Sequence, residues 1–305
     1  MTERSLLPVG FYDLIFDEAQ ENHRKINLAL DFFMRAHYRL IKTPLLEFAQ
    51  NFSDKQIQNS FTLVDVISGK NLVLRNDITP QIARVVSTFF RQGDLPLKIC
   101  YVGDVLFTKS NELYADRQST QVGLEIIGCD EHSHFEIIAR ILQILPQILT
   151  KKCIIEFSLP NFAQILCAEL KIAQSEDLID SIRKKDVLLI KKLAGKNADL
   201  ISEIVLWNND LENLSKLILS KANSKEIALK LENALLIKDY VAKNFAEVEI
   251  CFDLFGDDKN SYHEEIAFDI FCEGFSYPIA RGGKYKINAI DAVGATIYMN
   301  YLRRV

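Results

Sequence analysis

The strongest constraint on the fold is a change of pattern in the middle of the chain. Between about residues 160 and 245, leucine and isoleucine recur at steps of three and four residues and lysines multiply, which is typical of packed helices. On both sides of this block, apolar residues run in short alternating stretches that are typical of strands. The order strands, helical block, strands predicts an α+β fold: one antiparallel sheet flanked by helices, in a single domain 1–305 with a helical insertion at about 160–245.

The segments before the insertion predict three helices and two strand pairs. Apolar residues at helical spacing predict a helix over residues 17–38, and "HFEIIARILQILPQIL" predicts another. "FTLVDVIS" and "NLVLR", joined through "GK", indicate a hairpin, and "LKICYVGDVLF" and "STQVGLEIIGC" indicate a longer antiparallel pair. The hairpin leads into a helix that extends to about Gln92, and its start is marked by Asp77, Thr79 and Pro80.

Three strands and a closing helix are expected after the insertion. Strand character returns in "VEICFDLF", "EEIAFDIFCEG" and "SYPIARGG". The last stretch, "AVGATIYMNYLRRV", is expected to be a helix whose basic end suits the helix dipole. The polar segment 108–118, between the two long strands, is expected to form a mobile loop.

Charge and cysteine content exclude several classes of protein. Lysine and arginine number 36 against 41 acids, a net charge of −5, which provides no electrostatic footprint for nucleic acid. The six cysteines form no CxxC pair and no zinc-type cluster, so they are expected to be reduced core thiols. The N-terminus lacks a basic region followed by an apolar run, and no stretch of about 18 apolar residues occurs. We therefore expect a cytoplasmic protein without a metal, a cofactor or a membrane partner.

One strand presents an unusual polar face. In "STQVGLEIIG", alternation places Gln121, Gly123 and Glu125 on one face of the strand. An amide and a carboxylate beside a glycine would form a floor on which a small polar ligand could approach the backbone. The alternative is an ordinary solvated sheet face.

Three other polar stretches are ambiguous when each is taken alone. Asp77 and Thr79 are explained fairly well by capping of the helix that follows them. The two glycines in "YPIARGGKY" indicate a tight turn or a backbone wall beside a ligand, and the turn is favoured. The pair Tyr262 and His263 is compatible with packing or with surface exposure.

Taken in order, the motifs resemble those of one family. "LVLRNDITPQIAR", "CYVGDVLF", "DRQSTQVGLEIIG" and "ARGGKY" make the chain similar to the ATP phosphoribosyltransferase regulatory subunits, a non-catalytic family related to the class II histidyl-tRNA synthetase catalytic domain. The resemblance extends over essentially the whole chain. It implies a class II synthetase-like fold with a mostly antiparallel six-stranded sheet, a homodimer formed through a first motif near Pro44 to Glu47, and no anticodon-binding domain.

The resemblance also implies a pocket for free histidine. An acid near the ligand ammonium, an amide and a carboxylate around the imidazole, and aromatic walls would suit a zwitterionic amino acid. Arg117 is the one arginine retained from the phosphate-facing group. The expected site residues are Asp77, Thr79, Arg117, Gln121, Glu125, Tyr262, His263 and Tyr285.

The same resemblance shows where phosphate chemistry has been lost. Amino-acid adenylation requires cations where negative charge builds up on phosphate. The positions of the second-motif, third-motif and histidine-specific arginines are matched here by Phe107, Tyr301 and Asp258. Asp258 either repels the ligand carboxylate or lies in a solvent loop. A pocket with amino-acid contacts and without phosphate contacts is expected to bind its ligand and leave it unreacted.

These expectations favour one function and leave two alternatives. The favoured one is a regulatory subunit in the first step of histidine biosynthesis, which activates a short-form catalytic ATP phosphoribosyltransferase by assembly in a hetero-oligomer and senses histidine for feedback inhibition. The first alternative is a repurposed synthetase-like amino-acid-binding protein with another partner. The second is an ATP-dependent amino-acid-activating ligase, against which Phe107 and Tyr301 argue.

Overall fold

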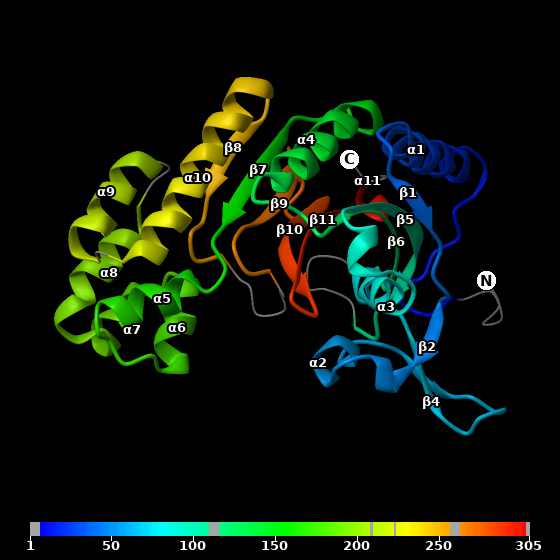
Figure 1. Cartoon of the computed structure of the whole chain (residues 1–305), viewed down its shortest axis with the longest axis horizontal. Coiled ribbons are helices and arrows are strands. Elements are labelled where there is room, and N and C mark those ends of the chain that lie inside the picture. Colours follow the sequence, from blue (N-terminus) through cyan, green and yellow to red (C-terminus); the bar gives the residue numbers. More distant parts are fainter. Residues whose placement is uncertain (1–6, 110–115, 208–209, 223, 257–262, 303–305) are drawn as a thin grey trace. The chain divides into compact units, whose positions relative to one another are not determined.

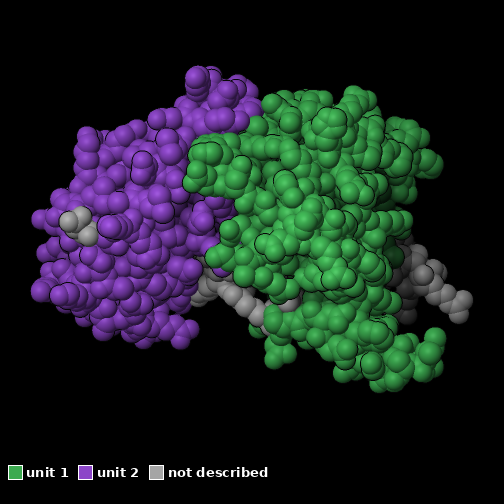
Figure 2. Space-filling model, viewed as in Figure 1, with its two compact units in different colours: residues 1–151, 271–282, 286–305 green, residues 152–270, 283–285 purple. Residues whose placement is uncertain are grey.

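A computed structural model describes the chain except for residues 1–6, 110–115, 208–209, 223, 257–262 and 303–305 (Figure 1). The described residues fall into two compact units (Figure 2). Unit 1 comprises residues 1–151, 271–282 and 286–305, and unit 2 comprises residues 152–270 and 283–285. Most of the segment 108–118, which was expected to be a mobile loop, lies outside the described residues, as do Asp258 and Tyr262.

Unit 1 is an α+β unit built on the strand order β1-β5-β6-β11-β10. The long antiparallel pair β5–β6 is confirmed, and so is the small hairpin β3–β4, which belongs to a three-stranded sheet of order β2-β4-β3. The bounds are α1 Phe16–Arg35, β1 Arg39–Ile41, β2 Leu46–Phe48, η2 Ala49–Asn51, α2 Asp54–Ile57, β3 Thr62–Val64, β4 Asn71–Leu74, α3 Thr79–Phe89, η3 Gln92–Asp94, β5 Leu97–Leu106, β6 Gln118–Ile127, α4 Ser133–Ile148, β10 Ala280–Ile287, β11 Ile290–Tyr298 and α11 Met299–Leu302.

Two amphipathic helices cover the sheet of unit 1. Helix α1 contacts β5 and β6, and helix α4 contacts β6 and β11 (Figure 1). The buried face of α4 includes Ile137, Ile138 and Ile141, each with no exposed surface. Burial of one such side chain contributes about 1.5–3 kcal/mol, so this helix is a main source of core stability and holds the sheet rigid beneath the polar residues of β6.

Unit 2 combines helices with short strands of order β9-β7-β8. Its helices α5 to α10 occupy the stretch in which helical periodicity was seen, and Ile201, Ile227 and Ile237 are among their fully buried residues. The bounds are β7 Cys153–Ser158, α5 Phe162–Glu169, α6 Glu176–Arg183, α7 Val187–Leu193, η4 Gly195–Asn197, α8 Ala198–Val205, α9 Leu211–Lys221, α10 Lys225–Asn244, β8 Glu249–Phe252 and β9 Ala267–Cys272.

The strand pairing is mixed, where a single antiparallel sheet was expected. β1 pairs with β5 and β7 pairs with β8 in parallel, whereas β6 pairs with β5 and β11 in the antiparallel direction. The orders of the two units together contain eight described strands, two more than the six expected. β1 is only three residues long, and a strand this short leaves a weak sequence signal.

The expected C-terminal helix is wrong over most of its length. β11 covers Ile290–Tyr298, and among the described residues of this stretch only Met299–Leu302 are helical. Ala292 to Ile297 are all buried, so the strand shows no apolar–polar alternation. A short apolar run that is buried on both faces cannot be told from a buried helix by periodicity. The β-branched residues Val293, Thr296 and Ile297 were the available sign of a strand.

The expected turn at the two adjacent glycines is also wrong. Gly282 and Gly283 lie inside strand β10. A Cβ on Gly283 would stand 2.6 Å from the carbonyl oxygen of Ile266 and 2.7 Å from the ring of His263, closer than real Cβ contacts. A glycine inside a strand often marks a place where another group approaches the backbone closely. Here the backbone of Ile266 and the ring of His263 approach Gly283 in this way.

Candidate functional site

The turn between β4 and α3 is fixed to the central strand β6. The backbone N–H of Ile78 donates to Asp77 Oδ1 at 2.8 Å and to Gln121 Oε1 at 3.1 Å. The Gln121 side chain also hydrogen-bonds to the Asp77 carboxylate. The residue that directly precedes helix α3 is Ile78, and it provides no side-chain cap. Capping of the helix therefore explains the polar side chain of Asp77 only in part. Gln121 connects the start of the helix to the sheet.

A chain of hydroxyl groups continues from this turn across β6. The Thr79 hydroxyl donates to Glu125 Oε1 at 3.0 Å and therefore does not cap the helix. The Tyr101 hydroxyl lies 3.3 Å from the same oxygen and 2.8 Å from the Thr296 hydroxyl. These four residues come from α3, β5, β6 and β11, so their positions depend on the whole sheet of unit 1. With Asp77 and Gln121 they form what we call the acidic cluster.

Glycines within strands make room for this cluster. A Cβ on Gly123 would lie 2.3 Å from the Tyr101 hydroxyl, and one on Gly294 would collide with the Glu125 carboxylate, 1.5 Å from Oε2. The space above Gly123, which was predicted to admit a ligand, is therefore occupied by Tyr101. Sequence reasoning missed Tyr101 because a tyrosine in an apolar strand is typical of a core residue. The glycine facing it was the available signal.

The β6 residues of the acidic cluster are buried, which excludes the solvated-face alternative for this strand, whereas Asp77 is partly exposed. Gln121 is 2% exposed and Glu125 is 1% exposed. Burial raises the pKa of Asp77, and hydrogen bonds from Thr79, Gln121 and Ile78 oppose that rise. Burial, reinforced by the charges of Glu125 and Asp77, raises the pKa of Tyr101 well above its ordinary value, so its hydroxyl stays protonated at neutral pH. The cluster thus combines two acids with neutral donors, a composition suited to a cationic group.

Arg75 and Arg117 make hydrogen bonds to residues outside the acidic cluster. Arg75 Nη1 donates to the Thr43 hydroxyl at 2.9 Å and to Gln81 Oε1 at 3.2 Å, and its Nε donates to the Asp104 carbonyl at 2.7 Å. Arg117 Nε donates to the Phe107 carbonyl at 3.1 Å, and its guanidinium group lies over two phenylalanine rings, Phe11 and Phe61. Arg117 therefore contacts the N-terminal segment through the Phe11 ring and the Val9 carbonyl.

Two of the remaining expected site residues belong to unit 2. His263 is partly exposed, and its ring lies against Gly283 of β10. Tyr285 is 4% exposed on the same strand. Tyr262 lies outside the described residues. Asp77, Thr79, Gln121 and Glu125 are thus the expected residues that unit 1 brings together.

The positions matched to synthetase arginines have a different character. Tyr301 is 7% exposed and packs edge-to-face on Tyr277, with ring centroids 4.8 Å apart, and it also contacts the rings of Phe275 and Tyr298. Burial raises the pKa of Tyr301, so it carries no charge at neutral pH. Phe107 pairs through its backbone with Arg117. Neither position offers a cation to a phosphate.

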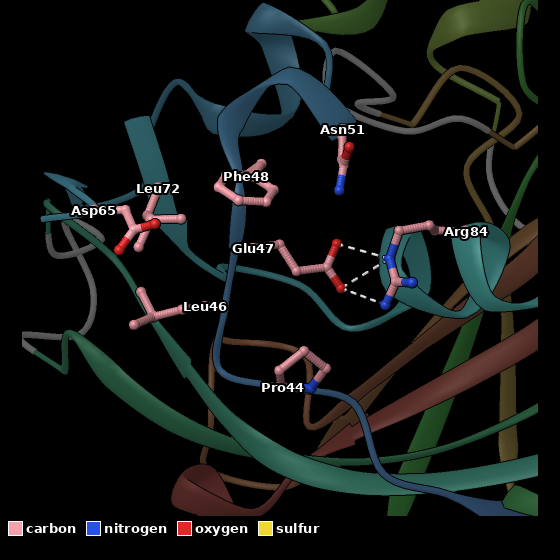
Figure 3. A pocket seen from close by; sticks show the side chains of 8 residues that line it. All are labelled: Pro44, Leu46, Glu47, Phe48, Asn51, Asp65, Leu72 and Arg84. Atoms are coloured by element: carbon pink, nitrogen blue, oxygen red, sulfur yellow. Dashed lines mark hydrogen bonds and ion pairs between the residues drawn. The ribbon is translucent and has the colours of Figure 1, made fainter. Parts of the chain in front are cut away.

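A groove on the small sheet is the second structural feature of unit 1. It has a volume of about 390 Å³ and is bordered by Pro44, Leu46, Glu47, Phe48, Asn51, Asp65, Leu72 and Arg84 (Figure 3). Glu47 points toward Arg84, and their ion pair is 2.6 Å long. The groove includes part of the Pro44 to Glu47 segment that was expected to form a homodimer.

Metal-binding clusters and membrane-spanning helices are both absent from the residues that the structure describes. These residues contain no cluster of three or more histidine, cysteine or acidic side chains with a geometry for holding a metal ion. None of their helices has the length and apolar character needed to cross a membrane. The six cysteines, all of them among the described residues, form no disulfide with one another.

Comparison with known proteins defines the class. The family model for histidyl-tRNA synthetase matches residues 10–302. The structure is similar to a protein of Bacillus halodurans described as an ATP phosphoribosyltransferase regulatory subunit/histidyl-tRNA synthetase, with a TM-score of 0.82, 19% identity, and coverage of 100% of this chain and 83% of that one. The chain therefore belongs to the histidyl-tRNA synthetase family, and the α+β class II synthetase-like fold is confirmed.

Within that family the chain groups with the ATP phosphoribosyltransferase regulatory subunits, as predicted. The regulatory subunit of Burkholderia cenocepacia is 30% identical over 295 residues, which cover 92% of this chain and 75% of the relative. The ATP phosphoribosyl transferase (HisG:HisZ) complex of Thermotoga maritima contains a chain of similar fold, with a TM-score of 0.72, 17% identity, and coverage of 93% of this chain and 97% of that one. The predicted non-catalytic, regulatory class is thereby confirmed.

Proposed function

We propose that this chain activates a short-form catalytic ATP phosphoribosyltransferase by assembling with it, and that free histidine bound at the acidic cluster lowers the activity of the assembly. The observation that carries the proposal is the contrast within unit 1. Glu125, Gln121 and the hydroxyl group of Thr79 are buried together beside the partly exposed Asp77, whereas the phosphate-side positions are Phe107 and Tyr301. Such a site favours a ligand that carries an amine and an imidazole over one that carries phosphates.

The chemistry of histidine matches that of the cluster. Its ammonium group can donate to a carboxylate such as that of Asp77, and its imidazole can donate to a second carboxylate such as that of Glu125. Gln121 supplies an adaptable amide beside the two acids. The family resemblance also implies roles in histidine binding for His263, Tyr285, Tyr262 and Arg117.

The partner proposal is supported by the relatives. The Thermotoga maritima structure is an ATP phosphoribosyl transferase (HisG:HisZ) complex, and the relative from Burkholderia cenocepacia is named a regulatory subunit. We extend this to a hetero-oligomer of the present chain with a catalytic subunit, in which two copies of this chain form a homodimer through the Pro44 to Glu47 segment. The groove and the exposed side chains Leu45 and Leu46, which are 42% and 37% exposed, provide an apolar surface for that contact. Six cysteines without a disulfide among them suit a reducing cytoplasm, where we expect this chain to act.

Reconstitution tests this function directly. The chain is mixed with a short catalytic subunit from the same genome, and phosphoribosyl transfer to ATP is measured with and without millimolar histidine. We expect the catalytic subunit to be poorly active alone, active in the assembly and inhibited by histidine, with a coupling free energy of about 1–3 kcal/mol. If the two proteins do not associate, or if the catalytic subunit is equally active alone, this chain is an amino-acid-binding protein with a different partner.

A further inference from the structure

Gln81 joins the start of helix α3 to the segment that forms the groove. Its Oε1 accepts from the Thr43 hydroxyl at 2.7 Å and from Arg75 Nη1 at 3.2 Å. Its Nε2 donates to the Pro44 carbonyl at 2.7 Å and to Glu47 Oε1 at 3.0 Å. The side chain has no exposed surface. One buried amide therefore makes four hydrogen bonds to two parts of the chain, the Thr43–Glu47 segment and Arg75, and we call this set the Gln81 junction.

The same helix carries contacts to both functional features. Two residues before Gln81, Thr79 donates to Glu125 of the acidic cluster at 3.0 Å. Three residues after it, Arg84 forms the 2.6 Å ion pair with Glu47, which borders the groove (Figure 3). The acidic cluster and the groove are thus attached to one helix on either side of the Gln81 junction, and all of these residues belong to unit 1.

This geometry restricts how the helix can move. A hydrogen bond weakens steeply as its length and angle depart from the usual range, and buried polar groups without partners are costly. A displacement of α3 on the order of 1 Å relative to the Thr43–Glu47 segment would break several of the four bonds at once. The displacement of lowest free energy is therefore one in which helix α3 and the Thr43–Glu47 segment shift together and keep these hydrogen bonds.

We propose that Gln81 is a positioning residue, through which ligand occupancy at the acidic cluster is transmitted to the Thr43–Phe48 segment and the groove beside it. A ligand that re-engages Thr79 and Asp77 displaces the start of α3, and the Gln81 junction carries the displacement into the backbone of that segment. By linkage, whatever docks at the groove changes the affinity of the cluster for its ligand by the same factor. The inference rests on the proposed function, because it takes free histidine as the ligand.

Hydrogen exchange with and without histidine tests this role. Free histidine is titrated into the wild type, Gln81→Met and Gln147→Met, and binding is measured by calorimetry while amide exchange is followed by mass spectrometry. Gln147→Met is the matched control, because it makes the same chemical change at an exposed position of α4. In the wild type and the control, we expect histidine to slow exchange by at least about threefold at residues 44–52 as well as at residues 77–86.

In Gln81→Met we expect the effect at residues 44–52 to be lost, whereas the effect at 77–86 remains and histidine affinity stays within about threefold of the wild type. A purely structural role would raise exchange at residues 44–52 equally with and without histidine. Thr43→Val removes the hydrogen bond from the Thr43 hydroxyl to Gln81 Oε1, together with the one that Arg75 Nη1 donates to that hydroxyl, and leaves the Gln81 side chain in place. It is used if Gln81→Met does not fold. It should reduce the histidine effect at 44–52 by about half.

Two results would overturn the inference, and they are distinguishable from failure of the proposed function. In the first, calorimetry shows histidine binding but exchange at residues 44–52 does not respond in the wild type. In the second, the response at 44–52 is unchanged in Gln81→Met or in Thr43→Val. Absence of any histidine heat in the wild type would remove the proposed effector itself, and this inference with it.

Discussion

The acidic cluster and the phosphate-side positions of unit 1 differ in the kind of side chain that they contain and in how those side chains are packed. In the cluster, polar groups are buried against hydrogen-bonding partners: Thr79 and Tyr101 share one oxygen of Glu125. At the phosphate-side position Tyr301, a buried phenol takes part in an aromatic group with Tyr277. Burial of unneeded polarity is costly, so the cluster indicates a ligand, whereas the aromatic packing indicates stability.

The difference shows how a binding site is separated from a catalytic one. Adenylation requires a preorganised set of cations around the phosphates, and a single arginine does not provide it. Arg117 is held over the rings of Phe11 and Phe61. Recognition of an amino acid requires only acids, amides and hydroxyl groups, all of which the acidic cluster contains. One unit of a synthetase-like fold is thereby suited to sensing without turnover.

The largest expected effect comes from placing an arginine at the phosphate-side position. Tyr301→Arg should cost about 3–5 kcal/mol of unfolding free energy, because an unpaired charge replaces a ring packed on three others. The melting temperature should fall by roughly 10 °C. Tyr301→Phe keeps the ring and should cost at most about 1.5 kcal/mol. A stable Tyr301→Arg protein that exchanges pyrophosphate into ATP when histidine is added would break the comparison.

The next largest effect concerns ligand recognition. Glu125→Gln should weaken histidine binding by about 1–3 kcal/mol, or roughly 5- to 150-fold, because a charged acceptor becomes a neutral amide. Titration calorimetry measures this change. Glu131→Gln makes the same replacement on a side chain that is 84% exposed, and it should leave the affinity within about twofold. Equal affinities for Glu125→Gln and the wild type would remove Glu125 from the site.

A smaller effect is expected in the pH dependence of stability. Because burial raises the pKa of Asp77, the folded protein binds this proton more tightly than the unfolded chain. The carboxylate therefore costs nothing at a pH below its ordinary pKa of about 3.9, and its cost develops as the pH rises through the raised value. Asp77→Asn removes this cost, so its melting temperature should exceed that of the wild type increasingly from pH 3.5 to neutral pH.

Calorimetric scans across that range measure the difference between Asp77→Asn and the wild type. The same variant should bind histidine more weakly, since the acid proposed to hold the ammonium group is gone. A constant difference, or a less stable Asn variant at neutral pH, would mean that the ionised Asp77 stabilises the fold. The acidic cluster would then be a structural feature.

The smallest effect sharpens the edge of the site. Arg117→Met removes cation–π contacts with Phe11 and Phe61, and should lower stability by about 0.5–1 kcal/mol while leaving histidine affinity within about twofold. Chemical denaturation and calorimetry measure the two quantities. A loss of histidine affinity beyond about tenfold would place Arg117 inside the histidine site, as the family resemblance implies. The contrast between the acidic cluster and the phosphate-side positions would then have to include a cation at the histidine site.

Parts of this fold and site follow from the sequence by simple periodicity. β3–β4 and β5–β6 were predicted because alternating β-branched runs are bounded by polar turns. Helix α3 was predicted because Pro80 marks a first turn. The pairing of Gln121 with Glu125 on one face followed from the two-residue period of a strand. Their meeting with Asp77 and Thr79 came from family resemblance, since no local pattern specifies which strands become neighbours.

Other parts depend on contacts that no local pattern records. β11 was taken for a helix because its residues are buried on both faces, and periodicity then disappears. Tyr101 was missed because its hydroxyl finds partners only when β5, β6 and β11 are aligned. Gly103, Gly123 and Gly294 each leave room for a polar side chain on a neighbouring element, namely Arg75, Tyr101 and Glu125. Glycine inside a strand is thus the sequence signal that would have found this cluster.

The most direct test of the separation between binding and catalysis is one calorimetric titration of free histidine, carried out with and without magnesium and ATP. The account predicts the same saturable isotherm in both conditions, because the acidic cluster binds the amino acid and the phosphate-side positions offer nothing to the nucleotide. The account is contradicted if no heat appears at millimolar histidine, or if ATP tightens histidine binding by about tenfold or more.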